Sequence, residues 1–292
     1  MASLKEIKGR ISSVRSTLKI TSAMKMVAST KLHKAQQASE RCAIYEQELA
    51  SILRIAKPSS LSALCREGAE SLPVAIIAFS SNSSLCGAFN ANVFKKALKM
   101  VDLCGGKDGV VLYAVGKKMA ESFAAAGIAS EGDWSEMAHH PGYAKACELA
   151  EKVIKGYVDG RFSKVIMVWN HFVSTSSQKP QVETLLPFDT SLLADLSSGN
   201  GAETYEDYIV EPGRERLFEQ LLPQVLRLKL YSVLLDSNAA EHAARTVAMQ
   251  IATDNGNEML SELTLEYNKG RQAKITAEIL DLAGGAQQEF FL

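Results

Sequence analysis

The last 69 residues, from Gln224 to Leu292, contain no proline, and this absence constrains the fold more than any other feature. Proline ends or kinks a helix, so a run this long without it is typical of one continuous helix. At roughly 1.5 Å per residue the helix would be on the order of 100 Å long, much longer than a globular core requires. It must therefore act mechanically or lie against another long helix.

A partner helix is predicted at the other end of the chain, where residues 1–57 also lack proline. Apolar residues recur there in steps of three and four, the spacing of a coiled coil, at Leu4, Ile7, Ile11, Val14 and Leu18. Beyond these positions we expect the seam to change register and to continue through Thr21, Met24, Ala28, Leu32 and Ala35.

In the C-terminal run the steps tend towards four, which departs from a strict heptad and predicts an irregular helix pair with local unwinding. The predicted seam residues are Val247, Ile251, Met259, Leu263, Tyr267, Ile275 and Ile279. Because glycine is a poor helix former, Gly256 and Gly270 indicate a helix that is loosely packed or closely approached by something else. Opposite charge favours pairing: residues 1–57 carry eleven Lys/Arg and four Asp/Glu, whereas residues 224–292 carry six and nine.

Short apolar runs alternate with helical segments in the middle of the chain, after a linker at residues 58–73. Strands are predicted at residues 73–81, 109–116, 163–174 and 181–188, and helices at 92–104, 117–127 and 143–158. This alternation predicts a parallel or mostly parallel sheet. We therefore expect an α/β protein with an antiparallel coiled-coil shaft formed by residues 1–57 with 212–292. A central, Rossmann-like α/β domain is expected over residues 73–205.

Several classes of protein are disfavoured by what the sequence lacks. No segment is apolar enough to span a membrane, and the N-terminus shows no secretory signal. The five cysteines are scattered without a C-x-x-C pair, so they give no metal signature and no disulfide framework, which fits a reducing compartment.

A loop expected at Ser80–Asn90 leads from a strand into a helix, a place where proteins can hold an anion. It lacks both glycine-rich phosphate motifs, so the alternative is a packing turn. Cys86 on this loop could be a nucleophile if a histidine lay nearby. The five histidines show no arrangement that supports this, and the alternative is a buried structural thiol.

Two further sites are weighed against plainer alternatives. His139 and His140, with Asp133 and Glu136 nearby in sequence, could hold a metal ion or could be ordinary surface loop. The basic N-terminal helix could bind nucleic acid, but it lacks interleaved aromatic residues and could equally be a solvated face beside an acidic helix. No catalytic, cofactor-binding or metal-binding residue is predicted.

Three separated motifs carry a resemblance to a known family. The first is IKGRISSVRSTLKITSAMKMVA, from Ile7 to Ala28, and the second is LCGAFN, from Leu85 to Asn90. The third is ATDN at residues 252–255, followed by YNKGRQAKITAEI at residues 267–279. In this order they resemble the gamma subunits of bacterial-type F-type ATP synthases over nearly the whole chain.

The resemblance implies a non-catalytic rotor shaft that couples ion flow through a membrane ring to ATP synthesis or hydrolysis on beta subunits. Its implied partners are three alpha and three beta subunits, the epsilon subunit and the membrane c-ring, without a cofactor or nucleic acid. The implied location is the cytoplasmic face of the bacterial inner membrane, as a peripheral protein without a direct membrane span. The alternative from the residues alone is a coiled-coil nucleic-acid-binding protein.

The resemblance also implies contacts with the beta subunits. Arg271 and Gln272 match positions that hydrogen-bond a loop of one beta subunit, and Lys95 matches a basic position that meets an acidic segment of another. Met24 and Lys25 match the point where the shaft passes the moving parts of the beta subunits.

Two other regions are implied to touch the rest of the motor. Tyr208 and Glu211 match a foot on the membrane ring, and the C-terminal Phe290, Phe291 and Leu292 would end in an apolar bearing. The chain departs from the family pattern at Ser83, where an arginine is usual, and at its end, where QQEFFL replaces small residues. These departures concern one electrostatic contact with beta and the fit of the bearing.

Overall fold

The computed structural model describes residues 3–56, 62–190 and 209–289, with side chains up to residue 281 in the last range. Its two long helices are α1 (Leu4–Ile55) and α6 (Arg214–Glu289). The chain forms two compact units, a smaller one of residues 1–27 with 246–292 and a larger one of residues 28–245. Both long helices contribute to both units.

The larger unit is built on one four-stranded sheet in the order β2-β1-β3-β4. Strand β1 (Val74–Phe79) pairs in parallel with β2 (Val110–Val115) and with β3 (Lys164–Ser174). Strand β4 (Ser177–Leu186) pairs antiparallel with β3. The prediction of a mostly parallel sheet is therefore confirmed, and the fourth strand completes a hairpin at its edge.

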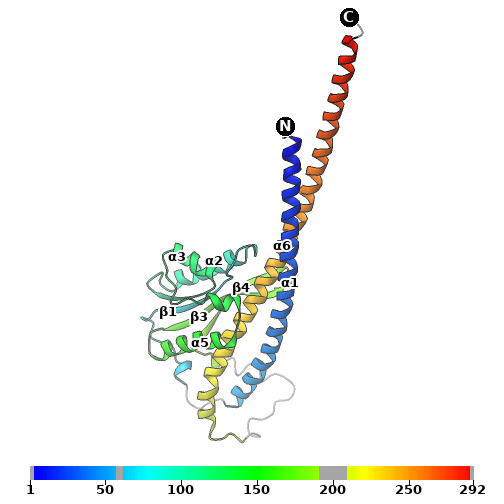
Figure 1. The fold of residues 1–292 in the computed structure, drawn as a ribbon. Helices are drawn as coiled ribbons and strands as arrows, with labels where there is room; N and C mark the ends of the chain where they lie inside the picture. Colours follow the sequence, from blue (N-terminus) through cyan, green and yellow to red (C-terminus); the bar gives the residue numbers. More distant parts are fainter. Residues whose placement is uncertain (1–2, 57–61, 191–208, 290–292) are drawn as a thin grey trace. The chain divides into compact units, whose positions relative to one another are not determined.

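Helices cover both faces of this sheet, which explains why strands β1 and β2 are almost continuously apolar (Figure 1). One face packs against α2 (Phe89–Leu103) and α3 (Lys117–Ala125). The other face packs against α5 (Tyr143–Val158) and the first part of α6. The result is a three-layer α/β arrangement, as expected from the alternation of strands and helices.

Two short elements were not expected from the sequence: the 3-10 turn η1 (Ala63–Cys65) and helix α4 (Ser135–His139). Both have too few residues to show a hydrophobic period. Helix α6 also begins before the proline-free run, so Pro223 lies inside it. The proline ring removes one backbone hydrogen bond, but Leu222 and Leu226 on either side are buried against the sheet and hold the helix in place.

Within the larger unit, α6 is buried on more than one side. Leu222, Leu226 and Leu230 pack against the sheet and α5. Leu228 and Leu235 pack against α1, with Cys42 and Leu49 as their neighbours. A helix that is apolar on several sides is typical of a protein interior, and here it joins the sheet to α1.

In the smaller unit the two helices run antiparallel, because Gly256 faces Leu18 and Gly270, further along α6, faces Leu4 near the start of α1. The α1 positions that are not fully exposed are Leu4, Ile7, Ile11, Val14, Leu18, Thr21 and Lys25. The α6 seam passes through Met249, Thr253, Gly256, Leu260, Leu263, Tyr267 and Gly270. Both sets alternate steps of three and four, which is a regular heptad.

Every predicted α1 seam position except Met24 is buried or half-buried, and on α6 the predicted positions Leu263 and Tyr267 lie in the seam. The expected register change is wrong, since Lys25 rather than Met24 continues the α1 seam. The expected irregular α6 seam is also wrong, because Ile251, Met259, Ile275 and Ile279 are exposed. A search for apolar periodicity passes over the seam positions that are occupied by glycine, threonine or lysine, such as Gly256, which Leu18 approaches closely.

Candidate partner-binding surfaces

In addition to its largely apolar seam, the smaller unit carries ten large apolar side chains on the outside of the helix pair. Those at least 40% exposed on α1 are Ile20, Met24, Met26 and Val27, and those on α6 are Ile251, Met259, Leu265, Ile275, Ile279 and Leu280. A free-standing coiled coil would have a predominantly polar outer face. Exposed apolar residues in this number mark a surface that a partner covers.

Arg271 and Gln272 are exposed on α6 in the same unit. Among the described side chains, no hydrogen bond or ion pair engages the guanidinium of Arg271, whereas Lys274, three residues further on, pairs with Glu278 at 3.6 Å. The backbone carbonyl of Gln272 accepts a hydrogen bond from the Thr276 hydroxyl at 3.0 Å. The donors of Arg271 therefore remain available to a partner.

Met24 and Lys25 do not share one environment, although they are adjacent in sequence. The side chain of Met24 is 40% exposed and faces away from the seam, whereas Lys25 is half-buried within it. Only Met24 is presented on the outer surface of the helix pair. Their predicted contact with the beta subunits stays a prediction.

Lys95 lies on α2 in the larger unit and is exposed. Its neighbours Val93 and Ala97 point the other way and are buried against the sheet. The amphipathic period of α2 thus fixes Lys95 on the solvent side of the domain. A basic side chain in this position can meet an acidic partner without rearrangement.

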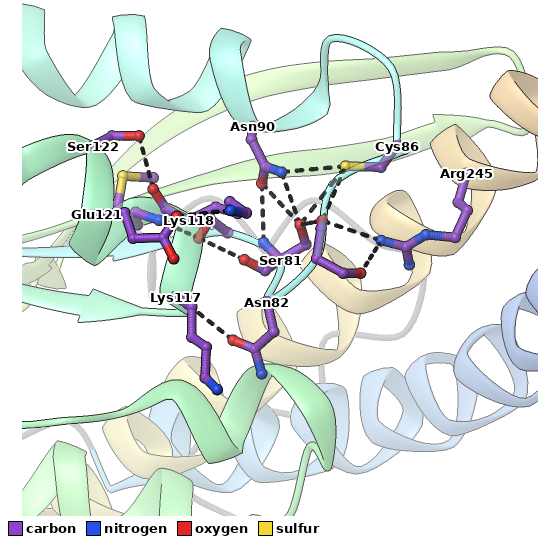
Figure 2. A network of polar contacts seen from close by, with 12 residues as sticks. Ser81, Asn82, Cys86, Asn90, Lys117, Lys118, Glu121, Ser122 and Arg245 are labelled. Atoms are coloured by element: carbon purple, nitrogen blue, oxygen red, sulfur yellow. Dashed lines mark hydrogen bonds and ion pairs between the residues drawn. The ribbon is translucent and has the colours of Figure 1, made fainter.

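Figure 2 shows the loop between β1 and α2, the region weighed as an anion site. Asn90 accepts a hydrogen bond from the Ser81 amide at 3.1 Å and donates to the Ser81 hydroxyl at 2.8 Å. Asn82 accepts from the Lys117 amide at 2.9 Å and donates to the Ser135 carbonyl at 2.7 Å. Because these polar groups bind one another, the loop is a packing turn.

Cys86 is 1% exposed and lies inside this network. Its thiol receives a hydrogen bond from the Asn90 amide at 3.3 Å and lies 3.7 Å from the Ser81 hydroxyl and 3.8 Å from the Ser83 carbonyl. None of these neighbours can act as the general base that a nucleophilic cysteine needs. The buried structural thiol is the alternative that the structure supports.

Ser83, the position at which the resemblance implies an arginine, is contacted by an arginine from α6. Arg245 donates a hydrogen bond to the Ser83 hydroxyl at 2.8 Å (Figure 2). It donates another to the Glu241 carboxylate at 2.6 Å. Burial raises the pKa of Glu241, and the charge of Arg245 opposes that rise. The sequence interpretation missed Arg245, although its spacing of four from Glu241 is the usual spacing of a helical ion pair.

The histidine pair shows no sign of a metal site. His139 ends α4, while the Asp133 carboxylate accepts a hydrogen bond from the Ser135 amide at 2.9 Å and Glu136 pairs with Lys145 at 3.9 Å. The Ser135 hydrogen bond is the main reason that the pKa of Asp133 is lowered. Within the described ranges, no group of three or more His, Cys, Asp or Glu side chains is placed to hold a metal ion.

The described residues include only part of the predicted membrane-ring foot and none of the predicted apolar bearing. Glu211 is exposed, three residues before α6 begins. Tyr208, Phe290, Phe291 and Leu292 lie outside the described residues. The foot and the bearing therefore stay predictions.

Comparison with known proteins identifies the family. A sequence model described as ATP synthase matches residues 3–288. The ATP synthase gamma chain of Phocaeicola vulgatus is 48% identical over 290 residues, covering 98% of this chain and 99% of that protein. The chain belongs to the ATP synthase gamma chain family. The gamma chain of Parabacteroides distasonis, at 41% identity with the same coverage, agrees with this.

Solved structures support the fold. A chain from the Euglena gracilis mitochondrial ATP synthase matches with a TM-score of 0.64 at 18% identity, covering 97% of this chain and 93% of that one. A chain from the central stalk and c-ring of the Tetrahymena thermophila enzyme matches with a TM-score of 0.54 at 21% identity, covering 80% and 99%. The comparisons give no support to the nucleic-acid-binding alternative. In the described part of the chain, no helix is long and apolar enough to cross a membrane.

Proposed function

We propose that this chain is the central rotor shaft of an F-type ATP synthase, which couples ion flow through a membrane ring to ATP synthesis or hydrolysis on the beta subunits. The observation that carries this proposal is the apolar outer face of the helix pair in the smaller unit. Besides the apolar residues of the seam, Ile251, Met259 and Ile275 face outward. Such a pair suits enclosure by other subunits, because its apolar groups then face protein rather than water.

The regular seam also suits transmission of torque. Close approach at Gly256 and Gly270 keeps the helix pair thin, and unbroken heptad spacing lets each helix brace the other. The pair has no rotational symmetry, so each surrounding beta subunit meets a different face at any moment. That difference in contact is a difference in binding free energy, which biases each beta site among its conformations.

The partners are, on this proposal, three alpha and three beta subunits, the epsilon subunit and the c-ring. The chain lies peripherally at the cytoplasmic face of a bacterial inner membrane. Residues 1–57 with 212–292 form the shaft, and residues 73–205 form the domain beside the membrane. Exposed positions at Glu211 and Lys95 are compatible with contacts to the ring and to an acidic segment of beta.

Within the shaft, Arg271 and Gln272 bind a loop of one beta subunit. Met24 and Lys25 lie where the shaft passes the moving parts of the beta subunits. Support for the first pair is the exposed guanidinium of Arg271, which no described side chain engages. Its donors can therefore be satisfied by a partner in one rotational position and released in the next.

The test is charge reversal at Arg271 in the assembled complex. Arg271→Glu should slow steady-state ATP turnover about tenfold, the usual effect of losing a hydrogen bond to a charged group, while the complex stays intact on gel filtration. The matched control is Lys274→Glu on the same exposed helix, which should change turnover much less. Equal turnover in the Arg271→Glu variant and the unmodified complex would contradict the proposed contact.

A further inference from the structure

A small cavity lies beside α6 in the larger unit, where strands β1 and β2 end. Phe79 and Val115, the last residues of the two strands, line it together with Ala138 on α4. Its volume is about 10 Å³, which is the space that a single water molecule requires. The volume therefore admits one water molecule and no larger ligand.

Four polar side chains line the same cavity: Ser80, Ser237, Asn238 and Glu241. All of them except Asn238 are buried. A cavity lined only by apolar side chains stays dry, whereas one that offers about two to four polar partners can hold a water molecule. The lining therefore has the chemistry of a hydrated site.

The Ser237 hydroxyl is the group that most needs a partner. Ser237 is 6% exposed, and no residue that the structure describes hydrogen-bonds to its hydroxyl. Other helical hydroxyls donate to the backbone carbonyl four residues earlier, as Ser122 does at 2.8 Å and Thr253 at 2.7 Å. Because a buried hydroxyl without a partner is unfavourable, a ligand in the cavity would satisfy Ser237.

Glu241, one helical turn beyond Ser237, offers an acceptor. Its Oε1 atom accepts a hydrogen bond from Arg245 at 2.6 Å. That ion pair balances the charge of Glu241, so the cavity calls for a neutral ligand and not a cation. A carboxylate can accept about four hydrogen bonds, which leaves room for a further donor. Burial raises the pKa of Glu241, and such a donor would favour its charged form.

The other two polar groups are partly engaged already. The Ser80 hydroxyl accepts a hydrogen bond from the Met119 amide at 2.9 Å and donates to the Ser81 carbonyl at 3.3 Å. The side-chain nitrogen of Asn238 donates to the Ala138 carbonyl at 3.5 Å, which leaves its side-chain oxygen as an acceptor. One donor and two acceptors on α6 therefore line the cavity, and they match the hydrogen bonds of one water molecule.

We propose that this cavity binds one ordered water molecule, which accepts a hydrogen bond from the Ser237 hydroxyl and donates one to the Glu241 carboxylate. Its second proton is donated to the side-chain oxygen of Asn238. The water links two successive turns of α6 at the point where the helix crosses the end of β1. This site is independent of the proposed rotor function.

A crystal structure of the full chain, at a resolution that shows ordered water, tests the proposal directly. Density for a water oxygen is expected within hydrogen-bond distance of both Ser237 Oγ and the Glu241 carboxylate. A cavity without density would overturn the proposal. A Ser237 hydroxyl bonded to the Val233 carbonyl, four residues earlier, would overturn it equally.

A variant tests the same site in solution. Ser237→Val removes the hydroxyl and adds a methyl group where the water would lie, so the water should be excluded. Oxygen-17 relaxation dispersion counts the water molecules held inside a protein, and the count should fall by one. The matched control is Ser122→Val, which removes a hydroxyl that bonds its own helix and should leave the count unchanged. Equal counts for the Ser237→Val variant and the unmodified chain, with the fold checked by circular dichroism, would refute the proposal.

Discussion

Gly256 of α6 faces Leu18 of α1 so closely that a Cβ atom on the glycine would lie 2.7 Å from the leucine Cδ2. The sequence left two explanations for a glycine in this helix, loose packing or close approach, and the structure supports close approach. Gly9 on α1 is different, because a Cβ atom there would meet nothing within 4 Å. These two glycines therefore predict opposite effects of substitution.

Gly256→Leu should destabilise the chain by about 1–3 kcal/mol, because a larger side chain forces the two helices apart. Gly9→Ala should stabilise it by about 1 kcal/mol, because alanine favours the helix and meets no neighbour. Thermal unfolding of the full chain, followed by helical circular dichroism, measures both. Equal effects of the two substitutions would mean that Gly256 is not at a helix contact.

The position of Lys25 in the seam gives a second prediction. Lys25→Leu should stabilise the chain by about 1 kcal/mol, because a polar residue in a coiled-coil core lowers stability. Met24→Ala, one residue away but outside the seam, should change stability by less than about 0.5 kcal/mol. Urea unfolding of both variants tests this. A larger loss of unfolding free energy for Met24→Ala would indicate that Met24 lies in the seam, as the sequence predicted.

Asp236 connects α6 to β3 through three hydrogen bonds. Its carboxylate accepts from the Trp169 indole at 2.7 Å and the Phe172 amide at 3.0 Å, and lies 2.7 Å from the His171 ring nitrogen. Asp236→Ala should cost about 2–3 kcal/mol, because it leaves partly buried donors without an acceptor. Urea unfolding followed by tryptophan fluorescence measures the loss. The control Asp254→Ala, at an exposed position, should have little effect.

His242 makes stability depend on pH. Burial lowers its pKa to about 4, and the charges of Arg245 and Lys31 add to the shift. The unfolded chain binds the proton near pH 6.5 and the folded chain only near pH 4, so the contribution is complete above pH 6.5 and is lost as the pH falls towards 4. Stability at pH 5 should be about 2 kcal/mol lower than at pH 7.5 from this group alone.

The measurement is urea unfolding at pH 7.5 and pH 5 for the unmodified chain and for His242→Gln, which cannot take up the proton. The pH-dependent loss should shrink by about 2 kcal/mol in the variant. The raised pKa of Glu241 acts in the opposite direction but is present in both proteins. His33→Gln, at an exposed histidine, is the control and should behave as the unmodified chain does. An unchanged loss in His242→Gln would show that His242 is not buried in the neutral form.

The sequence by itself determined the class of fold and the family. The absence of proline predicted two long helices, alternating apolar runs predicted the mostly parallel sheet, and three ordered motifs gave the resemblance that relatives at 41–48% identity confirm. Each of these signals is local, because it depends on neighbours in the chain. These signals can therefore be interpreted without knowing which elements pack together.

Only the tertiary structure decided which face of each helix lies inside. Apolar periodicity placed Met24, Ile251 and Ile279 in the seam, but the structure leaves these side chains outside and places Lys25, Thr253 and Gly256 within it. Pro223 is tolerated within α6 because its flanking leucines are buried against a sheet that is distant in sequence. The contact of Arg245 with Ser83 likewise joins residues far apart in the chain, so no local pattern could reveal it.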